Sequence, residues 1–115
     1  MVVTARRGDV VVLVGGRIGF RPAQEVLAVV VQNDALSAVA TRYVVVPVDR
    51  CPTAPTDFPP WVPLEGEAGL AGRWVATTDE IRRVPADSLA PSVRGRLSHG
   101  AMRRIDKALR WVLAL

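Results

Sequence analysis

Three short apolar runs constrain the fold of this chain more than any other feature. They are Val10–Val14, Val26–Val31 and Tyr43–Val48, and the turn signals Gly15-Gly16 and Gln32-Asn33-Asp34 follow the first two. Continuous β-branched residues over so few positions favour strands that are buried on both faces. The runs are also far shorter than the roughly 20 residues that cross a bilayer, so we expect no membrane span.

Proline and glycine divide the chain after the third run. Because Pro47 lacks an N–H, it is expected at a sheet edge or a bulge. The five prolines between Cys51 and Pro63 exclude a helix and favour a stiff surface loop that leads into a strand at Trp61–Leu64. Turns are then expected at Gly66, Gly69 and Gly72. Further extended segments are expected at Arg73–Thr78 and Ile81–Val84.

The pattern changes to a helical period near the end of the chain. Ser98 is placed as an N-cap, and a stripe of apolar residues follows at helical spacing: Met102, Ile105, Leu109, Val112 and Leu113. Cationic residues occupy the other side of this helix, so the apolar stripe should pack on the sheet. Upstream of the helix, a short helical turn is expected near Asp87–Ala90. The sequence predicts one domain over residues 1–115, mainly β with a C-terminal helix, as a small, partly open β-barrel.

Charge and cysteine content narrow the classes of function. The net charge is +4, from 15 basic and 11 acidic residues, and residues 88–115 contain six basic residues against Asp106 alone. This surplus fits a solvated helix face or a nucleic-acid contact. The lone Cys51 and the single His99 exclude a disulfide framework and a zinc site of several thiolates, so we expect no metal and no cofactor. The N-terminus lacks the order of a secretory signal, which favours a cytoplasmic protein.

Six segments, in order along the chain, resemble the MazF/PemK toxins of toxin-antitoxin pairs. They are Arg7-Gly8-Asp9-Val10-Val11, Ala28 to Asp34, Val45-Val46-Pro47-Val48, Gly69-Leu70, Asp79 to Val84, and Gly95 to Ser98 with Met102 and Ile105 to Leu109. The resemblance implies an SH3-like barrel, a homodimer, a MazE-like antitoxin partner, and metal-independent cleavage of single-stranded mRNA by an endoribonuclease.

The chain departs from the family at two positions of the active site. Family members usually carry Arg-Pro directly before the second strand and Thr directly after the third. Here Val26-Leu27 and Asp49-Arg50 stand there, and the only Arg-Pro is Arg21-Pro22. A catalytically silent MazF-like protein that binds an antitoxin or RNA is therefore a second hypothesis. A topoisomerase poison of the CcdB type, acting through its C-terminal residues, is a third.

Cleavage by the ribose 2′-OH requires a base, an acid for the 5′ oxygen, and cations or N–H donors around the phosphate. The catalytic candidates are Arg21, Asp49 and Asp79. Arg50 and Arg82 are candidates for binding RNA phosphate, and Gln32 and Asn33 for binding an unstacked base. Each also fits a turn, a cap or a surface ion pair, such as Arg82 with Glu80. Trp61 and Trp74 fit base stacking, core packing or a dimer contact.

Overall fold

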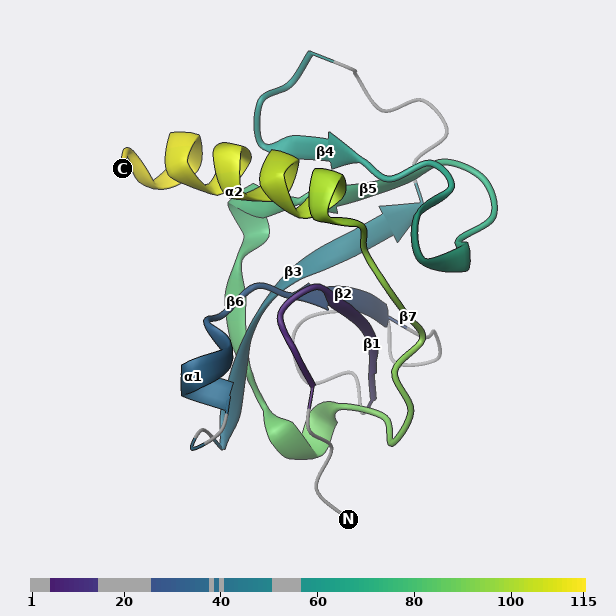
Figure 1. Ribbon diagram of the computed structural model, residues 1–115, viewed down its shortest axis with the longest axis vertical. Helices are drawn as coiled ribbons and strands as arrows, with labels where there is room; N and C mark the ends of the chain where they lie inside the picture. Colours follow the sequence, from purple (N-terminus) through teal and green to yellow (C-terminus); the bar gives the residue numbers. More distant parts are fainter. Residues whose placement is uncertain (1–4, 15–25, 38, 40, 51–56) are drawn as a thin grey trace.

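The computed structural model of the protein describes residues 5–14, 26–37, 39, 41–50 and 57–115 (Figure 1). Its strands are β1 (Asp9–Leu13), β2 (Val26–Val30), β3 (Arg42–Arg50), β4 (Trp61–Pro63), β5 (Trp74–Thr77), β6 (Arg82–Pro85) and β7 (Gly95–Arg96). Its helices are α1 (Asp34–Ser37) and α2 (His99–Leu113), with 3₁₀ turns η1 (Glu67–Gly69), η2 (Thr78–Glu80) and η3 (Ala86–Ser88). Every strand predicted from the sequence is present, and Gly66, Gly69 and Gly72 all have positive φ.

The strands form one antiparallel sheet in the order β4-β5-β3-β2-β1-β7, with β6 paired to β3 outside this path. The long strand β3 changes its pairing partner along its length. Its first half, Arg42–Val45, pairs with β6, and its last residues, Val48–Arg50, pair with β5. The sheet curls around this strand into a half-barrel (Figure 1), which confirms the predicted mainly β, partly open barrel with a C-terminal helix.

Pro47 lies in the middle of β3, not at an edge or a bulge as expected. Neither β5 nor β6 pairs with it, because it falls in the gap between Val45 and Val48 where β3 changes partner. Its carbonyl accepts a hydrogen bond from Thr77 Oγ1 at 3.3 Å on this side of the strand. The missing N–H therefore leaves no ladder bond unmade, although the predicted position was wrong.

Alternate residues of the central strands enter two separate cores. Val10, Val29 and Val46 pack in the core on the side of α2, and Val11, Val30 and Val45 pack in the core on the other side. All six are fully buried. Burial on both faces explains why these strands are continuous apolar runs and do not alternate with polar residues.

Helix α2 closes the first core. Ser98 Oγ accepts a hydrogen bond from Ala101 N at 3.1 Å, which confirms the predicted N-cap. Ala101, Ile105 and Ala108 are buried against the sheet, and the cationic residues Arg103, Arg104, Lys107 and Arg110 face solvent. The C-terminal end of the helix projects past the sheet (Figure 1). None of the helices described here is both long enough and apolar enough to cross a bilayer.

Candidate active site

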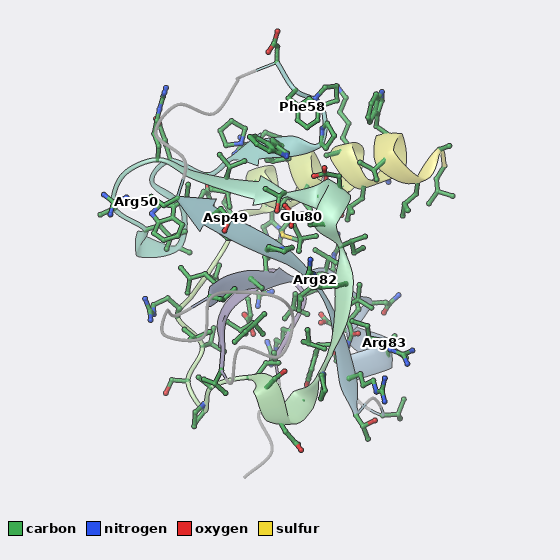
Figure 2. The ribbon with its side chains drawn as sticks, turned by 180° about the vertical axis from the view of Figure 1, so that it is seen from behind. Asp49, Arg50, Phe58, Glu80, Arg82 and Arg83 are labelled. Atoms are coloured by element: carbon green, nitrogen blue, oxygen red, sulfur yellow. The ribbon has the colours of Figure 1, made fainter. Side chains whose placement is uncertain are left out.

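The end of β3 presents Asp49 and Arg50 to opposite faces of the sheet. Asp49 pairs with Val75 and Arg50 pairs with Trp74, which packs against the core beneath α2. Arg50 thus lies on the α2 side, where its Nη2 is 3.3 Å from the position that a Cβ would take on Gly72. Asp49 lies on the face away from α2 and is exposed (Figure 2). The side chains of Asp49 and Arg50 therefore lie on opposite faces of the sheet.

Strand β2 begins beside Asp49. Leu27 pairs with Val48, so Val26, the first residue of β2, lies next to the end of β3. Arg21-Pro22 precedes this strand but lies outside the described residues, and its role stays a prediction. The first residue of β2 thus lies beside the exposed carboxylate of Asp49.

The acidic turn η2 packs against β3 and holds two further carboxylates. Thr78, at its start, is buried and donates to the Pro60 carbonyl from its backbone N at 3.0 Å and from its hydroxyl. Asp79 and Glu80 follow and are exposed. The bond to Pro60 fixes the turn to the segment that precedes β4, so Asp79 extends from an anchored backbone.

Arg82 lies on the same face as Asp49 and is held by Glu80. It pairs with Val45 on β3, and residues 45 and 49 share a face because side chains alternate along a strand. Its Nε donates to the Glu80 carbonyl at 3.3 Å and its Nη2 lies 3.7 Å from Glu80 Oε2, which confirms the expected surface pair. Figure 2 shows Asp49, Glu80 and Arg82 on one face, with Arg50 and Arg83 directed elsewhere.

Gln32 and Asn33 lie at the opposite end of β2, away from Asp49. Gln32 is buried; its Oε1 accepts from Val44 N at 3.0 Å and its Nε2 donates to Ser37 Oγ at 2.9 Å. Asn33 Oδ1 accepts from Ala35 N at 2.8 Å and so caps α1. Both amides form hydrogen bonds within the chain, and the structure does not bring them to the carboxylate group.

Two residues of this face were not among the candidates. Glu80 appeared in the sequence only as a surface partner of Arg82, and Phe58 is an exposed aromatic residue before β4. The proline-rich context of Phe58 gives no periodicity from which its orientation could be predicted. His99, by contrast, is the first residue of α2 and lies apart from this face.

A match to a known protein family covers nearly the whole chain. A family model described as the PemK-like, MazF-like toxin of type II toxin-antitoxin systems matches residues 6–113. The chain belongs to this family. No curated protein sequence matches it.

Solved MazF structures share the fold of this MazF-like chain. An endoribonuclease of a mycobacterial species, in complex with its cognate antitoxin, superposes with a TM-score of 0.77 at 23% identity and covers 96% of each chain. The Mycobacterium tuberculosis toxin MazF-mt6 gives 0.75 at 15% identity, over 93% of this chain and 97% of the other. A MazE-MazF structure from Deinococcus radiodurans gives 0.74 at 19% identity, over 97% of both chains. At these identities the likeness establishes the fold.

The candidate site of this MazF-like chain combines acidic and cationic side chains. Asp49, which the resemblance aligns with the usual Thr, is an exposed carboxylate at the end of β3. Asp49 shares its face with Arg82, and Asp79 lies on the turn that packs against β3. The arrangement offers carboxylates that can take or give a proton and a cation that can contact a phosphate.

Proposed function

We propose that this chain is the toxin of a type II toxin-antitoxin pair and a metal-independent endoribonuclease that cleaves single-stranded mRNA. The observation that carries the proposal is the placement of Asp49 on the same sheet face as Arg82, at the point where β2 begins. Family membership and the naming of two structural neighbours as endoribonucleases support it.

The proposed reaction needs no group beyond side chains and RNA. Asp49 takes the proton of the ribose 2′-OH, and the 2′ oxygen attacks the adjacent phosphorus. The bond from phosphorus to the 5′ oxygen breaks, leaving a 2′,3′-cyclic phosphate and a 5′-OH. Asp79, when protonated, supplies the proton for the 5′ oxygen, and Arg82, together with Arg21, stabilises the charge on the phosphate.

We also propose two protein partners and a location. An antitoxin is expected because some neighbours are MazE-MazF complexes, and an acidic segment would complement the exposed cations of α2. A homodimer is expected through the end of α2, where Trp111 is 63% exposed and Leu115 is 87% exposed. Exposed apolar residues that gather in one place mark protein contacts. We place the protein in the cytoplasm, where its mRNA substrate is.

The test uses the purified full chain with fluorescently labelled single-stranded RNA in excess EDTA. We expect cleavage to a 2′,3′-cyclic phosphate, and a loss of about 10²- to 10⁴-fold in rate for Asp49→Asn, as for removal of a general base. Asp87→Asn, at an exposed acid of η3, is the matched control and should cleave at the wild-type rate. Intact RNA with the wild-type protein would refute the nuclease.

A silent binding protein on the same fold is the second candidate. The contact of Glu80 with Arg82 favours it, because a carboxylate beside the guanidinium competes with phosphate. It predicts RNA or antitoxin binding without cleavage. DNA breaks with intact mRNA in growth-arrested cells would instead indicate a CcdB-like topoisomerase poison.

A further inference from the structure

Phe58 and Trp61 form a fixed aromatic pair in the turn that leads into β4. Trp61 N donates to the Phe58 carbonyl at 3.0 Å, which closes the turn. The two rings meet edge to face, with centroids 5.3 Å apart and planes at 88°. Phe58 is 42% exposed, and Trp61 is partly buried. The two rings thus pack in the edge-to-face arrangement that aromatic pairs favour, with part of the Phe58 ring at the surface.

The pair lies on the sheet face that carries Asp49. Trp61 is in register with Thr77, whereas the next residue, Val62, is in register with Ala76 and enters the core beneath α2. Trp61 therefore faces away from α2. Thr77 donates to the Pro47 carbonyl across the sheet, and Pro47 and Asp49 share a face of β3.

The turn of the aromatic pair is also bonded to the acidic turn. The Pro60 carbonyl, between Phe58 and Trp61, accepts both donors of Thr78, and Asp79 is the next residue. Figure 2 shows Phe58 beyond Glu80 and Asp49, on the side of β4. Since β5 alone separates β4 from β3, the backbones of these strands lie about 10 Å apart.

The indole N–H of Trp61 is buried, and it has no acceptor among the residues that the structure describes. The ring thus offers no donor to a ligand at the surface. Trp61 contributes by packing against Phe58, and Phe58 is the ring that a ligand reaches.

We propose that Phe58 is a stacking platform for an unpaired base of single-stranded RNA, with Trp61 as its positioning residue. This inference rests on the proposed function and adds the subsite beside the scissile phosphate. Every base has a flat π-face, so stacking selects single-stranded RNA without fixing its sequence. The base belongs to a nucleotide near the reacting phosphate, because the turn of Phe58 leads into β4 and only β5 separates β4 from the strand that carries Asp49.

The experiment separates stacking from cleavage. The probe is a single-stranded RNA with one 2-aminopurine and 2′-O-methyl groups on every ribose, which removes the nucleophile. We expect wild-type protein to quench the fluorescence and Phe58→Leu to bind about 5- to 150-fold more weakly, as for one stacked base. Phe58→Tyr should bind within about twofold of wild type, because it keeps the ring. Val93→Ala, at an exposed apolar residue outside the aromatic pair and outside the groove at the end of α2, is the control and should bind normally.

A double-mutant cycle tests the positioning role. Trp61→Leu should weaken binding in the wild-type background but not in Phe58→Leu, because Trp61 acts through the Phe58 ring. Equal losses in both backgrounds would contradict this role.

The outcomes distinguish the inference from the proposed function. Phe58-dependent binding of the methylated probe, with unmethylated RNA left intact, supports the platform and refutes the nuclease. If Phe58→Leu changes neither RNA cleavage nor probe binding, the stacking role of Phe58 is overturned and the proposed nuclease function still stands. A changed sedimentation coefficient with unchanged RNA affinity makes Phe58 a protein contact and overturns the platform. A wild-type protein that binds no RNA overturns both.

Discussion

The guanidinium of Arg82 is held by Glu80 at two points. Its Nε donates to the Glu80 carbonyl at 3.3 Å, and its Nη2 lies 3.7 Å from the carboxylate Oε2. Both side chains are partly exposed, 31% for Arg82 and 44% for Glu80. The carboxylate therefore orients the cation in the unliganded protein and competes with any phosphate that approaches it.

Removal of this competition should strengthen RNA binding. Glu80→Gln is expected to raise affinity for single-stranded RNA by about 1.4- to 5-fold, which corresponds to the roughly 0.2–1 kcal/mol of an exposed ion pair. Arg82→Ala should weaken binding and reduce the slope of log K against log salt by about 0.7, the value for one phosphate contact on a single strand. Fluorescence anisotropy over a KCl series measures both.

Arg73→Ala is the matched control for Arg82→Ala, because Arg73 also forms a surface pair, with Glu65 at 2.6 Å. Its salt slope should equal that of the wild type. An unchanged slope in Arg82→Ala would show that Arg82 does not contact phosphate.

Alanine substitutions at Gly95 in β7 and at Gly100 in α2 should change the free energy of unfolding in opposite directions. A Cβ on Gly95 would lie 2.6 Å from the carbonyl oxygen of Ala68, whose own φ is +52°. Gly95→Ala is expected to destabilise the protein by about 1–3 kcal/mol through this overlap. Gly100→Ala should stabilise it by up to about 1 kcal/mol, since a Cβ there meets nothing closer than Ser98 Oγ at 3.8 Å and alanine favours the helix.

Urea unfolding followed by circular dichroism measures both changes, with the m-value as a check that the unfolded state is unaltered. Equal midpoints for Gly95→Ala and wild type would contradict the close approach of β7 to η1.

The fold was predictable where local signals and long-range pairing agree. The β-branched runs became β1, β2 and β3, and Ser98 capped the terminal helix. Strand β7 was not predicted, because a pairing of two residues, Gly95–Arg96, exists only against β1 and leaves no local pattern. The stripe predicted for α2 was also incomplete: Ala101 and Ala108 are buried, whereas Leu113 is half exposed where the helix passes the sheet.

The site was predictable only as a set of residue types. Which of Asp49 and Arg50 faces the candidate site depends on strand register, and a shift of one residue would exchange them. Gln32 illustrates the same limit. As a polar residue after a strand it fits a surface contact, but hydrogen bonds to Ser37 and Val44 hold it inside the fold.

Glu67 and Ser98 should be energetically coupled. Ser98 donates to Glu67 from its backbone N at 2.8 Å and from its hydroxyl at 3.0 Å, while its Oγ caps α2. Ser98→Ala is expected to cost about 1 kcal/mol through loss of the cap. Glu67→Gln should cost less in Ser98→Ala than in wild type, with a coupling of about 0.5 kcal/mol or more. Additive losses in thermal unfolding would argue against the coupling.

The projecting end of α2 should control self-association. Trp111 lies in a groove of about 590 Å³ that is lined by Pro59, Ala108 and Leu115 and by the cations Arg104, Lys107 and Arg110. Because Trp111 is largely exposed, Trp111→Glu should change the free energy of unfolding of the monomer by no more than about 0.5 kcal/mol. Burying the new carboxylate between two copies would be costly, so the dimer should dissociate at least tenfold more readily in sedimentation velocity. Val93→Glu, at an exposed apolar residue outside this groove, should not change the dimer. A Trp111→Glu protein that sediments as wild type would place the dimer contact elsewhere.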